Sequence, residues 1–180
     1  MKKTLTLILT FPFIFLAAQD NDNACKYISS ELKEKPLECI DKSTFKKNDE
    51  VYQIFKWSAF KDNYLIRIEH TGNKYILVKK KIFTGEYDQK TGEKIDSRFT
   101  ILVQKNLTQK QYVQFMKLLS ENHFWTNNDY NVPSTCNDGS GIFIHALKKN
   151  SFLKMSNGNC SPKDEYLNTL YQKIIELFNL

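Results

Sequence analysis

The chain has 180 residues, a formal net charge of +6 and 41% hydrophobic residues, and its composition shows no low-complexity tract. This length and composition suit one globular domain with its own core and exclude a fibrous or disordered chain. Removing a signal peptide that contains Lys2 and Lys3 lowers the charge from +6 to +4, an excess too small to indicate nucleic-acid binding.

The first residues follow the three-part pattern of a secretory signal peptide. Two lysines precede an apolar run over residues 5–16, and Ala17 and Ala18 then provide small residues at a cleavage point. The run is short for a membrane span, and a short membrane anchor is the alternative interpretation. We expect a signal peptide over residues 1–18 and an exported bacterial protein, periplasmic or extracellular, with no stable membrane span after cleavage.

The rest of the chain divides into an N-terminal extension over residues 19–49 and a single domain over residues 50–180. In the extension, the stretch NACKYISSELKEK predicts one short helix that turns Tyr27 and Ile28 inward and ends before Pro36. Residues 46–49 are expected to form a loop that leads into the domain.

From Glu50 onward, apolar and polar residues alternate with the period of a β-strand. The pattern predicts strands over residues 50–57, 63–70, 74–83 and 98–103, and the short turns between them require mostly antiparallel pairing. The lysines at positions 79–81 cannot all point one way. We expect the third strand to be an edge strand protected from further pairing, with a docking patch for an acidic partner as the alternative.

Two helices and a hairpin follow these strands. Thr108 and Gln111 form a T-x-x-Q capping box, and residues 142–147 and 151–156 are expected to pair as a hairpin. Ser161 and Pro162 are typical of the start of the last helix. The fold predicted is α+β, with a single antiparallel sheet of about five to six strands and two helices packed on one face. The side chains expected to be buried are Tyr112, Phe115, Met116, Leu119, Leu167, Leu170, Tyr171, Ile174 and Phe178, with Trp57 and Trp125 largely enclosed.

The four cysteines, Cys25, Cys39, Cys136 and Cys160, are an even number in a chain expected to be exported, which favours disulfides. No C-x-x-C pair supports a zinc site, and free thiols are the other alternative. In the predicted hairpin, opposed residues have numbers that sum to about 299, and 136 and 160 sum to 296. We therefore expect a Cys136–Cys160 bridge beyond the open end of the hairpin, and a local Cys25–Cys39 bridge. The other two connectivities stay open.

The Cys136–Cys160 bridge makes a testable prediction. Replacing Cys136 with serine should lower the free energy of unfolding by about 2–5 kcal/mol, because the bridge closes a loop of about 25 residues in the unfolded chain. Non-reducing peptide mapping of the exported protein checks the pairing directly. A peptide that links Cys136 to Cys25 or Cys39, or a free Cys160, would contradict it.

Residues that could carry chemistry are few. The sequence contains no zinc-protease, nucleophile-elbow, P-loop or dinucleotide motif, and we predict neither a metal nor a cofactor. An oxygen-rich loop over residues 127–138 suggests calcium, but its spacing does not match a calcium-binding loop. The candidate site residues are Asp129, Asp138, His123 and His145.

Several stretches resemble a family of small exported bacterial proteins of unassigned function. They are VYQIFKWSAFKDNYLIRIE, GNKYILVKKKIFTGEYD, LTQKQYVQFMKLLSENHFW and DGSGIFIHALKKNSFLKMS, which together span about residues 51–180. In that family's pattern, D-G is followed by an aromatic residue and then by an acid. Here Ile142 and His145 occupy those places, so a site built on that acid does not carry over, and the resemblance implies no activity.

These observations favour a small exported, disulfide-stabilised protein that binds an unknown protein or envelope partner and is not an enzyme. The alternative is an envelope hydrolase that uses Asp138 with His145 or His123. The two functions differ in one structural requirement, because a hydrolase needs two of the candidate site residues to meet in a cleft.

Overall fold

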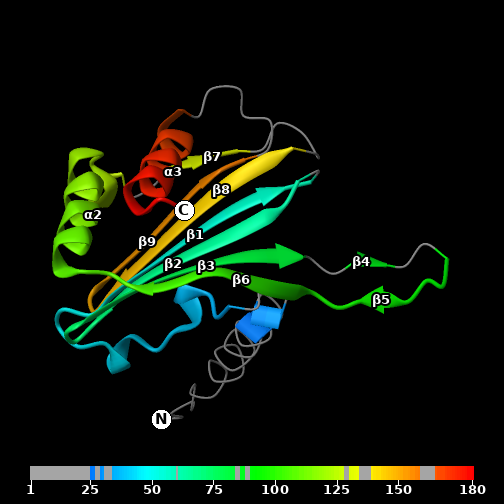
Figure 1. Ribbon diagram of the computed structural model, residues 1–180, viewed down its shortest axis with the longest axis horizontal. Coiled ribbons are helices and arrows are strands. Elements are labelled where there is room, and N and C mark those ends of the chain that lie inside the picture. The colour runs from blue at the N-terminus through cyan, green and yellow to red at the C-terminus, as the bar shows by residue number, and fades with distance from the viewer. Residues whose placement is uncertain are drawn as a thin grey trace, which may run out of the picture.

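A computed structural model describes residues 25–26, 29–30, 34–59, 61–83, 86–87, 90–127, 130–133, 139–158 and 165–180 (Figure 1). Its main layer is a seven-stranded sheet with the strand order β6-β3-β2-β1-β8-β9-β7. The strands are β1 (Glu50–Ser58), β2 (Asn63–Thr71), β3 (Lys74–Phe83), β6 (Arg98–Asn106), β7 (Asn131–Val132), β8 (Ser140–Lys148) and β9 (Ser151–Asn157). Between β3 and β6, the short strands β4 (Glu86–Tyr87) and β5 (Lys94–Ile95) form a separate ribbon that projects from one end of the sheet.

The predicted α+β class is confirmed, but the prediction of a single, purely antiparallel sheet of five to six strands is wrong. Five neighbouring pairs in the main sheet are antiparallel, and β7 pairs with β9 in parallel. Strand β7 has two residues, which is too short to show the alternation that marks a strand in a sequence. The predicted hairpin register is confirmed, since Ile144 lies opposite Met155.

Helices α2 (Gln109–Glu121) and α3 (Glu165–Phe178) cover one face of the sheet, here called the helical face (Figure 1). The capping box at Thr108 and Gln111 is present. The C-terminal end of α2 is tied to α3 at Asn122, whose backbone oxygen accepts a hydrogen bond from the Tyr166 hydroxyl at 2.9 Å. Both helices bury the stripes predicted for them, except that Met116 is half-buried. Ser161 and Pro162 lie outside the described residues.

The core beneath the helices is built from alternate side chains of the central strands. Tyr52 and Ile54 of β1 are 1% exposed, and the residues between them point to the opposite face of the sheet. Trp125 packs against this core but is itself only half-buried, not largely enclosed as expected. Trp57 is only half-buried, and its place in the alternation of β1 puts it on the other face, so the expected enclosure of Trp57 is wrong.

Glu50, at the start of β1, connects three elements. Its Oε2 atom accepts hydrogen bonds from the hydroxyls of Tyr52 at 2.9 Å and Tyr112 at 2.6 Å. Its Oε1 atom lies 2.9 Å from Nζ of Lys148, whose ammonium group is 4.3 Å from the centre of the Trp125 ring. One carboxylate therefore fixes α2 and β8 against β1 at this end of the sheet.

The N-terminal extension covers part of the opposite face, here called the extension face. Its short 3-10 helices are η1 (Leu37–Cys39) and η2 (Lys42–Thr44). Leu37 is fully buried against Val51 and Leu147, in a small core separate from the one beneath the helices. Residues 25–26 and 29–30 are helical, whereas Tyr27 and Ile28, which were expected to turn inward, lie outside the described residues.

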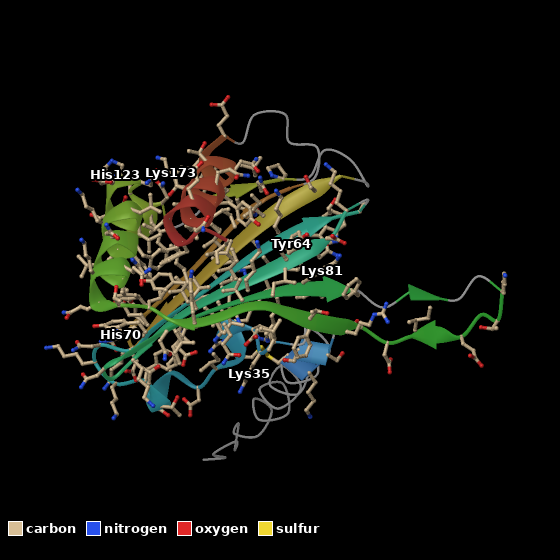
Figure 2. The ribbon with its side chains drawn as sticks, viewed as in Figure 1. Lys35, Tyr64, His70, Lys81, His123 and Lys173 are labelled. Atoms are coloured by element: carbon tan, nitrogen blue, oxygen red, sulfur yellow. A yellow bond between two sulfur atoms is a disulfide. The ribbon has the colours of Figure 1, made fainter. Side chains whose placement is uncertain are left out.

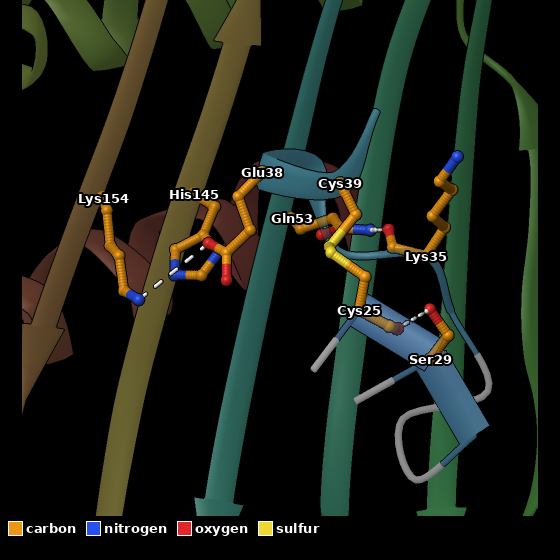
Figure 3. The surroundings of a disulfide bond; sticks show 8 residues. All are labelled: Cys25, Ser29, Lys35, Glu38, Cys39, Gln53, His145 and Lys154. Atoms are coloured by element: carbon orange, nitrogen blue, oxygen red, sulfur yellow. Dashed lines mark hydrogen bonds and ion pairs between the residues drawn. A yellow bond between two sulfur atoms is a disulfide. The ribbon is translucent and has the colours of Figure 1, made fainter. Parts of the chain in front are cut away.

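The Cys25–Cys39 disulfide is present, with 5.8 Å between the Cα atoms (Figure 3). It joins the helical residues of the extension to η1, the element that inserts Leu37 into the extension-face core. Cys136 and Cys160 lie outside the described residues, so their bridge stays a prediction.

Strand β3 is not an edge strand, so that prediction is wrong. It pairs with β2 on one side and β6 on the other, and β6 is the edge. The three lysines are accommodated because their side chains alternate between the two faces of the sheet and have partners on both faces. Lys80 contacts Glu34 of the extension at 2.5 Å, while Lys81 contacts Asp62 at 2.7 Å. Strand β6 has a register shift opposite Lys79 and Lys80, a distortion typical of protected edges.

Among the described residues, no helix combines the length and the apolar character needed to cross a membrane.

The packing of the helices predicts the effect of shortening their buried side chains. Leu119→Ala and Ile174→Ala should each lower the free energy of unfolding by about 2–5 kcal/mol, because both side chains are at most 1% exposed and their loss leaves cavities. Val113→Ala is the matched control, since Val113 lies on α2 with 57% of its surface exposed. Urea unfolding measures all three. A change below about 0.5 kcal/mol at both buried positions would show that the packing faces are misassigned.

Candidate functional site

The structure does not bring the two candidate histidines together. His123 lies directly after α2, is exposed, and has a left-handed backbone conformation with φ of 53° (Figure 2). His145 lies on β8 and points to the extension face, so the sheet separates the two side chains. Asp129 and Asp138 lie outside the described residues. The pairing of Asp138 with a histidine therefore stays a prediction, and a site that uses both histidines is excluded.

His145 is held beside the disulfide-linked part of the extension. Its Nδ1 atom lies 3.9 Å from Oε2 of Glu38 in η1, and the same oxygen lies 3.9 Å from Nζ of Lys154 (Figure 3). Its Nε2 atom is buried and has no hydrogen-bond partner among the described residues. Burial lowers the pKa of His145 to about 4, against an opposing effect of Glu38. The side chain is therefore neutral near pH 7, and it packs against the Phe152 ring.

A groove on the helical face is the feature that sequence analysis missed. It is a hollow of about 710 Å³ at the end of the sheet where β1 stops and β2 begins, away from Glu50. A second hollow of about 270 Å³ adjoins it, because Lys56, Gly139 and Ser140 line both. We call the two hollows together the lysine groove. Its remaining described lining residues are Ser58, Lys61, Asp62, Tyr64, Gly141, Ile142, Asn157, Gly158 and Asn168.

Strand register places the groove side chains next to one another. Lys56 of β1 lies opposite Tyr64 of β2, and Tyr64 lies opposite Lys81 of β3. All three share the helical face with Tyr171 of α3, whose ring centre is 4.9 Å from Nζ of Lys56. Lys79, one pair further along β3, has its ammonium group 5.3 Å from the centre of the Tyr64 ring. Figure 2 shows Tyr64 and Lys81 at the opposite end of the sheet from His70.

The charges in this region are not balanced. Asp62 accepts from the Tyr64 hydroxyl at 3.2 Å and pairs with Lys81, and the hydrogen bond from Lys81 is the main reason that its pKa is lowered. Lys56 and Lys79 are half-buried and have no carboxylate partner among the described residues. Burial lowers the pKa of Lys79. The cation–π contacts to Tyr171 and Tyr64 offset only part of the cost of removing these ammonium groups from water.

Tyr64 and Tyr171 contribute the surfaces of their rings and do not act as acids or bases. Burial, followed by the effect of Tyr64, raises the pKa of Tyr171 to about 12. Burial and the hydrogen bond to Asp62 also raise the pKa of Tyr64. Both hydroxyls therefore stay protonated near pH 7. The groove thus presents unpaired cations beside protonated phenol rings, an arrangement that can hold an anionic group.

Sequence analysis could not find the groove, because its described lining residues come from β1, β2, β8, β9, α3 and the segments next to these strands. The lysine run at positions 79–81 was a partial signal, because it suggested a docking patch for an acidic partner. That signal could not reveal Lys56, which joins the lysines of β3 only through the pairing with β2. Among the described residues, no group of three or more His, Cys, Asp or Glu side chains could hold a metal ion.

Comparison of the chain with protein-family models and with curated proteins finds no match to either.

The buried histidine predicts a pH dependence of stability. Below about pH 6.5 the unfolded chain protonates His145, while the folded chain, with a pKa of about 4, does not, so acidification favours unfolding. Between about pH 7.5 and pH 5, the free energy of unfolding should fall by about 2 kcal/mol more in the native protein than in His145→Asn. Urea unfolding at several pH values measures the difference.

His123→Asn is the control for this experiment, because it makes the same substitution at an exposed histidine. If the free energy of unfolding falls by the same amount in the native protein and in His145→Asn over this pH range, His145 is not held in its neutral form.

Proposed function

We propose that the protein is an exported, disulfide-stabilised binding protein that takes an anionic group of an envelope or protein partner into the lysine groove. The observation that carries this proposal is a pair of half-buried lysines with no carboxylate partner among the described residues. Lys56 lines the groove, and the ammonium group of Lys79 lies over the ring of the lining residue Tyr64. An ammonium group removed from water is costly without a counter-charge, and a bound anion would provide one.

The shape of the groove supports binding rather than chemical transformation. Its two hollows together are within the size range of small-ligand sites, about 300–1,000 Å³. Lysine ammonium groups act as point charges, so they accept carboxylate, phosphate or sulfate without the fixed fork geometry of arginine. The described lining residues include no histidine or cysteine that could act as a general base or nucleophile.

Export is part of the same proposal. It is supported by the pattern of residues 1–18 and by the Cys25–Cys39 disulfide, because disulfides persist in oxidising compartments. The protein for the binding experiments is therefore the exported form, which is expected to lack residues 1–18 by intact-mass analysis.

Titration of the ¹⁵N-labelled protein tests the groove. The probes are inorganic phosphate, citrate and a hexaglutamate peptide, added at low and at physiological salt. We expect saturable shifts of the backbone amides of residues 56–64 and 139–141 with at least one probe. The affinity should fall at the higher salt, because partly exposed charges are screened.

Paired variants make the test specific. Lys56→Gln combined with Lys79→Gln should weaken binding at least tenfold, whereas Lys149→Gln should leave it unchanged, since Lys149 is exposed in the turn between β8 and β9. The proposal is wrong if no probe causes saturable shifts up to about 10 mM, an affinity too weak for a dedicated site. It is also wrong if the double variant binds as tightly as the native protein.

A further inference from the structure

Another hollow, apart from the two that form the lysine groove, lies on the extension face at the same end of the sheet. It has a volume of about 520 Å³, and we call it the aromatic hollow. Its described lining residues are Phe55, Trp57, Asn131, Val132, Pro133, Phe143, Ser156, Asn157 and Gly158. Neither of the two core clusters includes Phe55, Trp57 or Phe143, and all three are half-buried.

The aromatic side chains form one surface. Phe55 of β1 lies opposite Phe143 of β8, and their rings are nearly parallel, with centres 6.2 Å apart and planes at 27°. Trp57, two residues along β1, lies opposite Gly141, where a Cβ atom would come within 2.9 Å of the backbone oxygen of Asn157. The β1–β8 pair therefore presents a platform of half-buried aromatic rings instead of another layer of core.

Polar groups gather along one side of this platform. Strand β7 pairs with β9 there, and the Ser156 hydroxyl donates to Oδ1 of Asn131 at 2.5 Å. The backbone amide of Ile142 donates to Oδ1 of Asn157. Both amide oxygens are thus engaged, and neither Nδ2 group has a partner among the described residues. Both side chains are thus held in place, with Asn131 exposed and Asn157 5% exposed at the border of the hollow.

The hollow contrasts with the lysine groove in charge. No described residue that lines it is ionisable, whereas the groove on the opposite face contains several lysines. A charged ligand would lose its hydration here without gaining a counter-charge, so the fitting ligand is neutral. A purely apolar ligand would leave the amide donors unpaired.

We propose that the aromatic hollow is a binding site for a neutral saccharide. A sugar ring has a face of C–H groups, which packs on aromatic rings, and a rim of hydroxyls, which accept hydrogen bonds from amide groups. The hollow has both complements in the required arrangement, and its size is that of a site for a small ligand. This site shares Asn157 and Gly158 with the lysine groove, but the proposal does not depend on the anion-binding function proposed for that groove.

The exported full-length mature protein can be tested by NMR with maltotriose, cellotriose and triacetylchitotriose as probes. The two tryptophan indoles give separate signals and provide an internal comparison, because Trp57 lines the hollow while Trp125 packs beneath the helices. Binding of at least one probe should shift the Trp57 indole and the side-chain amides of Asn131 and Asn157. The Trp125 indole should not move.

Variants complete the test. Trp57→Ala should weaken binding at least tenfold, and Asn131→Ala, which changes an exposed residue and should not impair folding, should weaken it at least threefold. The Lys56→Gln, Lys79→Gln double variant should bind the saccharide normally, which separates this site from the lysine groove.

Three results would overturn the proposal. The first is the absence of any saturable Trp57 shift up to about 10 mM of every probe. The second is binding that persists unchanged in both Trp57→Ala and Asn131→Ala. The third is a concentration-dependent dimer in sedimentation experiments that Trp57→Ala abolishes, since the hollow would then be covered by a second copy of the chain.

Discussion

The pairing of β1 with β2 on one side and β8 on the other is the constraint on which the rest of the structure depends. Seven registered pairs join β1 to β2, and nine join it to β8. Because side chains alternate along a strand, this single register sends Tyr52 and Ile54 into the core beneath the helices and Val51 into the core beneath the extension. A slip of one residue would exchange the two faces and lose both cores.

The same register creates both candidate sites, because neither α2 nor the extension covers the last residues of β1. Towards its end, β1 places Lys56 on the helical face and Trp57 on the extension face. Helix α2 lies over the other end of the sheet, where Glu50 binds it, and the extension packs against Val51 and Leu147 at that end too. The end of the sheet that α2 and the extension leave uncovered therefore has a cationic surface on the helical face and an aromatic surface on the extension face.

Local patterns predicted much of the fold, and long-range contacts account for what they missed. The capping box, the buried helix stripes and the β8–β9 register each depend on residues close in sequence, and all are present. Strand β7 was missed because two residues carry no periodicity. The lysines of β3 suggested an edge strand because their partners are not visible in the local sequence. Glu34, which pairs with Lys80, lies far away in the chain, and Asp62, which pairs with Lys81, precedes the neighbouring strand β2. Of the candidate site residues, His123 and His145 proved to be separated by the sheet, a fact that no spacing in the sequence reveals.

The place of β1 in the sheet also sets the order in which the molecule can assemble. Strands β1, β2 and β3 follow one another along the chain, and β6 returns to β3 after the β4–β5 ribbon, so these pairings are local and can form early. Strand β8 joins β1 across the 81 residues from 59 to 139, which makes that contact slow to close. Until it closes, β1 is an open edge with apolar side chains on both faces, unlike β6 with its irregular register. A chain in which β8 has not yet paired therefore exposes an apolar strand edge, the feature that most favours aggregation in a partly folded chain.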